Sequence, residues 1–156
     1  MQTLAGIIFE ILFLIIVLII LIIIASIFII RDLKIELNKV QKIRARFHVE
    51  IRKIVNLIYN VHSPAYLEPF TKVVIKNLPH EEKKILLKNI DRAFQELNLD
   101  DNNDKYIIET YENLQAIRRE RDALILVYNQ KILIFPFSFY ARIMKLQKYE
   151  LYTEKE

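Results

Sequence analysis

The apolar stretch from Ile11 to Ile30 constrains the fold of this chain more than any other feature. Its twenty residues carry no charge, and Ser26 is the only one that is neither aliphatic nor aromatic. Twenty apolar residues in a helix span about 30 Å, which is the thickness of the hydrocarbon core of a bilayer. The sequence therefore predicts a transmembrane helix at residues 11–30, a short N-terminal tail at residues 1–10 and one domain at residues 31–156.

The residues that flank this stretch argue against a cleaved signal peptide and indicate an orientation. No Lys or Arg precedes the stretch, it is longer than the apolar core of a signal peptide, and no A-x-A cleavage site follows it. The flank that is rich in Lys and Arg usually faces the cytoplasm. The second flank, residues 31–53, holds eight such residues: Arg31, Lys34, Lys39, Lys42, Arg44, Arg46, Arg52 and Lys53. We therefore expect a single-pass protein of the cell membrane with its N-terminus outside and its domain in the cytoplasm.

The composition argues against most catalytic and cofactor-binding classes. The chain has no cysteine, which excludes disulfides, thiol catalysis and cysteine-based metal sites. Its single glycine, Gly6, excludes a glycine-rich phosphate loop. The three histidines, His48, His62 and His80, do not have the i, i+4 spacing of helical metal ligands, and no nucleophile motif is present. We expect no enzymatic activity, no metal and no cofactor.

Two charged stretches resemble ligand sites but are better explained otherwise. Residues 100–104 read Asp-Asp-Asn-Asn-Asp, yet Lys105 stands where a calcium loop requires glycine, so we expect a solvated connector. The basic residues 31–53 begin directly at the membrane and contain no recognised nucleic-acid motif. The first of them would attract anionic lipid instead.

Beyond the span, the chain has the pattern of an all-α protein. No glycine or proline lies between Gly6 and Pro64, so we expect the span to continue without a break into a helix that ends near residue 60, ~80 Å in all. A short helix is expected at about residues 66–77, and another after Asn77, which would cap it. A long helix is expected at about residues 103–134, followed by an aromatic, basic segment and a charged tail at residues 150–156.

The two long helices each carry an apolar seam with alternating steps of four and three, the pattern of an antiparallel bundle or a coiled coil. The first seam is Leu33, Leu37, Val40, Arg44, Phe47, Ile51, Ile54, Ile58 and Val61; the second is Ile107, Tyr111, Leu114, Arg118, Arg121, Ile125, Tyr128, Ile132 and Phe135. Three arginines interrupt these seams. Either their stems pack while the guanidinium groups reach solvent, or Arg44, Arg118 and Arg121 form a polar layer that fixes the register of the two helices. The acids available for such a layer are Glu36, Glu50, Glu120 and Asp122.

Two segments resemble the LemA family. Residues 128–141, YNQKILIFPFSFYA, are similar to its closing signature, Y-N-x-x-I-x-x-F-P-x-x-x-x-A, and Arg118-Arg119 stand where the family carries two arginines. Residues 49–53 and 56–61 are similar to an N-terminal segment of the family, although Tyr59 replaces a proline. The resemblance implies a bacterial membrane protein with a short tail, one membrane helix and an antiparallel helical domain. The family has no agreed enzymatic activity, so the resemblance implies a scaffold.

The segment from Phe135 to Tyr140 is the best candidate for an interaction site. It holds Phe135, Phe137, Phe139 and Tyr140, more aromatic side chains than one helical turn needs for its own core. These residues would pack on the end of the bundle, dock on the membrane interface or bind a partner. Antiparallel packing would bring the segment back towards the membrane, which favours docking among the functional alternatives.

Together these features predict a membrane-anchored, non-enzymatic helical scaffold or interaction protein of the LemA type. The expected partners are the lipid bilayer and other membrane proteins or further copies of the chain, with no nucleic acid; the sequence identifies no small-molecule substrate. The alternative is an envelope-organising protein that acts through an intermolecular coiled coil or by docking its aromatic C-terminal segment on the bilayer. A hydrolase or metal-dependent enzyme would need a buried cluster of acidic and histidine residues, which no sequence pattern indicates.

Overall fold

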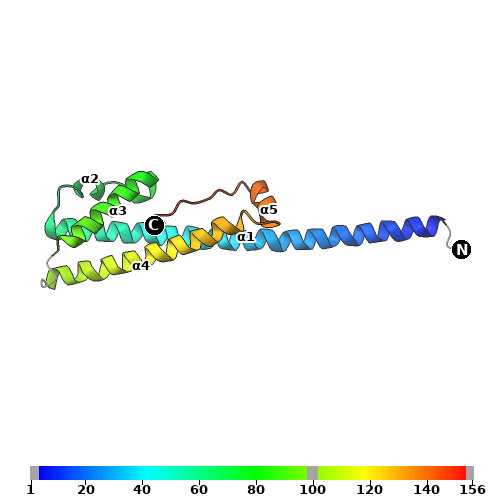
Figure 1. Ribbon diagram of the computed structural model, residues 1–156, viewed down its shortest axis with the longest axis horizontal. Helices are drawn as coiled ribbons and strands as arrows, with labels where there is room; N and C mark the ends of the chain where they lie inside the picture. Colours follow the sequence, from blue (N-terminus) through cyan, green and yellow to red (C-terminus); the bar gives the residue numbers. More distant parts are fainter. Residues whose placement is uncertain (1–3, 98–101, 154–156) are drawn as a thin grey trace.

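A single helix of 59 residues, α1 (Leu4–His62), runs the length of the molecule (Figure 1). The computed structural model describes residues 4–97 and 102–153. At 1.5 Å per residue, α1 is about 88 Å long. It is unbroken because the residues that interrupt helices, Gly and Pro, are absent between Gly6 and Pro64. Ser63, with a φ of 48°, and Pro64 end it.

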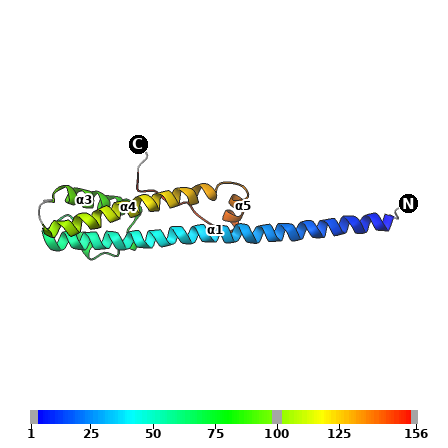
Figure 2. The same cartoon turned by 90° about the horizontal axis from the view of Figure 1, so that it is seen from below.

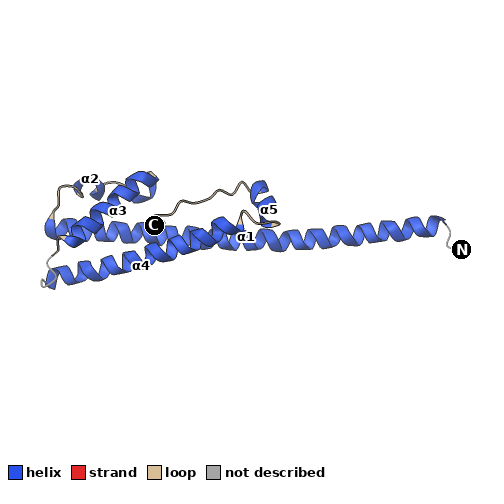
Figure 3. Cartoon of the chain, in the orientation of Figure 1, coloured by secondary structure: helices blue, strands red, loops and turns tan. Residues whose placement is uncertain are grey.

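The rest of the chain folds back along the C-terminal two-thirds of α1 as a series of shorter helices (Figures 1 and 2). In order, these are α2 (Glu68–Thr71), η1 (Ile75–Asn77), α3 (His80–Gln95), α4 (Asn102–Lys131) and α5 (Phe137–Ile143). Helix α4 lies antiparallel to α1 and makes the most extensive contact with it. The described part of the chain contains no strand (Figure 3). The expected all-α fold, with one apolar N-terminal helix that continues into an antiparallel helical bundle, is confirmed.

Two apolar clusters hold α1 and α4 together. The larger, at the end of the bundle distant from the N-terminus, combines α1, α3 and α4, and its centre is Phe47, Ile51, Ile54, Ile58, Leu86, Ile90, Ile107 and Leu114. The smaller lies nearer the apolar half of α1 and consists of Leu33, Val40, Ile125, Tyr128, Ile132 and Ala141. Full burial of one such side chain stabilises a fold by about 1.5–3 kcal/mol. The two seams contain about half of the buried apolar residues; most of the others lie on α3, in the connection that precedes it, and beside the seams on α1 and α4.

The last position predicted for each seam is not part of the core. Val61 is 45% exposed and Phe135 is 82% exposed, so neither belongs to the core. Helix α4 ends at Lys131 rather than Ile134. The N–H groups of Leu133 and Ile134 donate to carbonyls three residues back, those of Gln130 and Lys131, instead of four residues back as in an α-helix. The residue before Pro136 is also disfavoured in a helix.

The connection between α1 and α3 also differs from expectation. The single helix predicted at residues 66–77 is divided into α2 and η1, since Val74 is extended (φ −75°, ψ 106°) while Ile75 turns into the core. The predicted cap at Asn77 is wrong: Pro79 occupies the cap position of α3, and no side chain caps that helix. Glu81 and Glu82 do lie in the first turn, as expected.

The apolar half of α1 projects from the bundle with no other part of the described chain against most of it (Figures 1 and 2). Helix α1 is long and apolar enough to cross a membrane, and none of its most apolar stretch is buried in the protein. Residues 144–153, named here the C-terminal segment, leave α5 and run back beside α1 and α4 towards α3 (Figure 1).

Candidate functional site

Polar contacts fix the C-terminal segment to α4, and they begin at Asp122. One carboxylate oxygen of Asp122 accepts hydrogen bonds from the backbone N–H of Tyr152 (3.1 Å) and from the N–H and hydroxyl of Thr153 (2.7 Å each). The other oxygen accepts from Arg121, whose second terminal nitrogen donates to the carbonyl of Glu150 at 2.9 Å. Arg121 and Asp122 are both almost fully buried. A buried ion pair is tolerated only when its remaining polar atoms are also satisfied, and here the backbone of the segment satisfies them.

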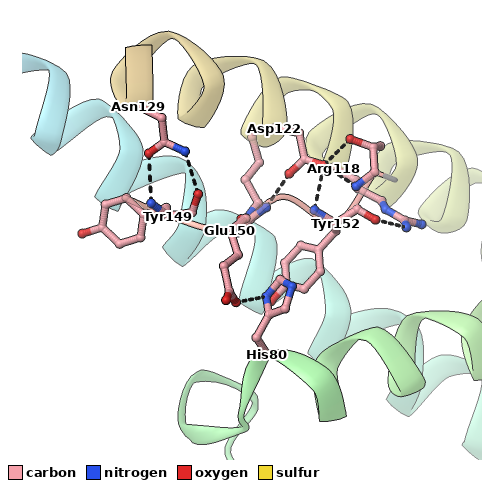
Figure 4. A network of polar contacts seen from close by, with 9 residues as sticks. His80, Arg118, Asp122, Asn129, Tyr149, Glu150 and Tyr152 are labelled. Carbon is pink, nitrogen blue, oxygen red and sulfur yellow. Dashed lines mark hydrogen bonds and ion pairs between the residues drawn. The ribbon is translucent and has the colours of Figure 1, made fainter. Parts of the chain in front are cut away.

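A second anchor lies two turns along α4, at Asn129. Its side-chain amide donates to the carbonyl of Tyr149 (2.7 Å), and its oxygen accepts from the N–H of Tyr149 (2.9 Å). Asn129 thereby pairs with the segment as a neighbouring strand would. Figure 4 shows that these contacts, together with those of Arg118, come from one side of α4.

The third anchor, Arg118, joins the segment to α3. It donates to the carbonyl of Tyr152 at 3.0 Å and lies 3.6 Å from Asp91 on α3. Asp91 also accepts from Tyr111 (2.9 Å) and Gln115 (3.0 Å) on α4. Burial, and then the hydrogen bond to Asp91, raise the pKa of Tyr111 to about 12.

The three seam arginines thus meet around the C-terminal segment, since Arg44 lies over the ring of Tyr149, 4.4 Å from its centroid. Of the acids expected as partners, Asp122 bonds Arg121, but both belong to α4. Oε2 of Glu50 is buried without a hydrogen-bond partner.

The ion pairs that do join α1 to α4 involve other cations. Lys131 lies 2.6 Å from Asp32 and 3.9 Å from Glu36, and Arg46 lies 3.8 Å from Glu120. The seam pattern missed these pairs because their residues flank the seams. The hypothesis that the three arginines fix the register of the helices stays a prediction.

The C-terminal segment itself was missed, because residues 150–156 read as a charged tail. Tyr152 is only 5% exposed, and its ring stacks on His80 at 4.5 Å. The available signal was the interleaving of Tyr149, Leu151 and Tyr152 with charged residues. That pattern is short, and the charged residues beside it are typical of a solvent-exposed tail.

The aromatic residues 135–140 separate into two groups. Phe137 and Tyr140 pack against the smaller apolar cluster, and the Tyr140 hydroxyl hydrogen-bonds with that of Ser26 inside the apolar stretch of α1 (2.5 Å). Phe135 and Phe139 point outward, the latter 57% exposed. Helix α5 therefore lies beside the end of the predicted span.

Exposed apolar side chains lie on α5 and in the turn that precedes it. Besides Phe135 and Phe139, the group contains Leu133, Ile134 and Ile143, each more than half exposed. We name these five residues the apolar rim. Five exposed apolar side chains within eleven residues make this segment a candidate for a membrane or protein contact.

The described residues show no group of three or more His, Asp or Glu side chains that could hold a metal ion. His62 instead lies 2.6 Å from Asp104, and His80 lies 3.2 Å from Glu150. Most of the acidic connector at residues 100–104 lies outside the described side chains.

Comparisons of the chain with protein-family models, with curated proteins and with solved structures found no match.

Proposed function

We propose that this chain is a single-pass, membrane-anchored helical scaffold of the LemA type, without catalytic activity. The observation that carries the proposal is the uncovered apolar half of α1, which continues as one rigid helix into the bundle. Exposed Ile, Leu and Phe side chains over about 30 Å of helix match a bilayer core and are costly in water.

The orientation in this proposal has the N-terminus outside and the bundle in the cytoplasm. Arg31 and Lys34 are exposed immediately after the apolar stretch, and residues 1–10 contain no Lys or Arg. Such a bias usually keeps the basic flank on the cytoplasmic side.

The apolar rim would dock on the cytoplasmic interface of the same bilayer. Its support is the contact of Tyr140 with Ser26, four residues before the end of the apolar stretch. A helix held at that depth has its outward-facing Phe139 and Ile143 at the level where lipid chains meet head groups. Arg142 and Lys145, both exposed, would face anionic head groups and add about 1 kcal/mol each.

The scaffold is favoured over an intermolecular coiled coil because the seam of α1 is already in use. Its central residues, Phe47, Ile51 and Ile54, are fully buried, and α4 of the same chain contributes to the cluster that covers them. A second copy or another membrane protein would contact different surfaces. Equilibrium sedimentation in detergent separates the two, since an intermolecular coil requires at least a dimer.

Docking of the rim can be tested with spin labels, because the chain has no cysteine of its own. We would label Phe139→Cys in the full chain, reconstituted in bilayers, and measure its collisions with oxygen and with a water-soluble nickel complex. The matched control is Val49→Cys, an apolar residue 64% exposed on α1 and nineteen positions beyond Ile30.

The proposal predicts that the label at position 139 collides mainly with oxygen, which concentrates in lipid, whereas the label at position 49 collides mainly with nickel. If both labels respond as fully aqueous, the rim does not dock. The span itself would not be refuted by that result, since it is tested separately by topology.

A further inference from the structure

A polar cavity of about 360 Å³ lies where α1, α3, α4 and the C-terminal segment meet. Its volume falls in the range of small-molecule sites. It is distinct from the apolar rim and from any contact with the span. Its lining is Arg44, Lys76, Leu78, His80, Lys83, Arg121, Lys148, Tyr149, Glu150 and Tyr152.

Positive charge dominates this lining, with five cations and one carboxylate. The carboxylate, that of Glu150, lies 3.2 Å from Nδ1 of His80. Arg121 is paired with Asp122, which is not one of the lining residues. Within the described residues, no carboxylate lies at ion-pair distance from the other four cations, which are Arg44, Lys76, Lys83 and Lys148.

Lys83 is the most informative of these cations, because it is only 6% exposed. Its ammonium group donates to one backbone carbonyl, that of Lys76, at 3.1 Å. Burial, followed by the charges of Arg44 and Arg121, lowers the pKa of Lys83. A buried ammonium held by one neutral acceptor beside two guanidinium groups is costly unless an anion compensates it.

Two neighbours bear on this positive potential. His48 on α1 responds to it: its pKa is lowered to about 4 by burial and then by Lys83, Arg44, Arg121 and Lys76. Helix α3, sixteen residues long, begins at His80 on the cavity wall with no side-chain cap, so the positive end of its dipole lies at this wall. Glu81 and Glu82 in its first turn are both exposed.

We propose that this cavity binds a soluble anion that carries two or more phosphate groups. Lys83 and Arg44, the two lining cations that are neither exposed nor ion-paired within the described residues, would bind the inner phosphate, next to Arg121, which Asp122 and the Glu150 carbonyl hold in place. Lys76 and Lys148, which are exposed, would bind the outer one. Arginine donors suit phosphate because their planar fork can bind two oxygens.

The position of the cavity favours a soluble ligand over a lipid head group. Arg44 lies fourteen residues beyond Ile30, which is about 21 Å along α1. Head groups extend only roughly 5–7 Å beyond the hydrocarbon core. This step uses the proposed span, whereas the anion site itself does not.

Tripolyphosphate is the probe, titrated calorimetrically into the full chain in nanodiscs of neutral lipid. The wild-type chain should bind it at one site, and Lys83→Met should weaken binding by about tenfold or more. The matched control is Lys88→Met on the same helix, which is exposed and outside the lining; it should bind as the wild type does. The His48 resonance gives a second readout, because a bound anion should raise its pKa.

Three results would overturn the proposal. One is the absence of saturable binding at millimolar tripolyphosphate while circular dichroism shows a folded chain. Another is equal weakening by Lys83→Met and Lys88→Met, which would indicate attraction by net charge alone. The third is loss of tripolyphosphate binding when the neutral nanodiscs are replaced by nanodiscs with anionic lipid, which would assign the cavity to a head group. Arg44→Gln provides an independent variant if Lys83→Met does not fold.

Discussion

Asp122 organises the C-terminal segment more than any other single residue. Its carboxylate holds Arg121 and three donors of Tyr152 and Thr153. Asp122→Ala should leave Arg121 as an uncompensated buried charge and destabilise the fold by about 3–5 kcal/mol. Thermal unfolding in detergent measures the loss, and hydrogen exchange at the Tyr152 amide should accelerate.

Glu120→Ala is the matched control for this prediction. Glu120 is an exposed neighbour on α4 and lies 3.8 Å from Arg46. Its removal should cost less than about 1 kcal/mol, since exposed ion pairs contribute little. Equal losses for the two variants would contradict the role assigned to Asp122.

His48 makes the fold sensitive to acid. Because its pKa is lowered from 6.5 to about 4, the folded chain binds fewer protons here than the unfolded chain between these values. This contribution to stability is therefore complete above pH 6.5 and is lost as the pH falls towards 4. An NMR titration should give a midpoint near 4 for His48, and His48→Gln should flatten the acid dependence of the melting temperature. A midpoint near 6.5 would remove the basis for the positive potential at this position.

At the level of single residues, some features of the site could be predicted from the sequence and others could not. The interruption of the seams by Arg118 and Arg121 was visible. Their acceptors on the C-terminal segment, however, are backbone carbonyls of residues about thirty positions away. Carbonyls are identical in every residue, so no sequence pattern identifies them. The cationic cavity was not predicted for a related reason, since its five lysines and arginines come from five separate elements: α1, η1, α3, α4 and the C-terminal segment.

At the scale of elements, α1 and α4 depend on a shared apolar interface. Ile51 is fully buried in the larger cluster. Ile51→Ala should destabilise the fold by about 2–5 kcal/mol, because it removes buried methyl groups and leaves a cavity. Thermal unfolding in detergent is the measurement.

Val49→Ala, two residues away, provides the comparison. Val49 is 64% exposed, so its truncation should change stability by no more than about 0.5 kcal/mol. If both variants melted alike, the α1–α4 interface would not be the one described.

Helical periodicity explains why these two elements were predicted well. Seam positions repeat over eight turns, so local errors average out, and the long run without Gly or Pro fixed the continuity of α1. The short elements had no such averaging. At α3 the prediction relied on a single residue, Asn77, whereas the cap position is Pro79 and no side-chain hydrogen bond caps the helix.

At the scale of the whole molecule, a rigid rod joins an uncovered apolar end to a charged bundle. The bundle folds back so that α5 reaches the end of the apolar stretch, and the C-terminal segment then runs away from it (Figure 1). If the apolar stretch spans a bilayer, the rim lies at its surface and the cationic cavity lies beyond the head groups in water. The two surfaces would therefore serve different partners.

Membrane topology is the most direct test of this account. Single cysteines would be placed at Lys72, an exposed residue after α2, and at Gln2, before the apolar stretch. Intact cells producing each variant would be treated with a membrane-impermeant maleimide, and a second sample would be treated after lysis. We predict that the cysteine at position 72 reacts only after lysis, whereas the cysteine at position 2 reacts in intact cells. Labelling of position 72 in intact cells, with position 2 protected, would contradict a cytoplasmic bundle and assign the domain to the outer face.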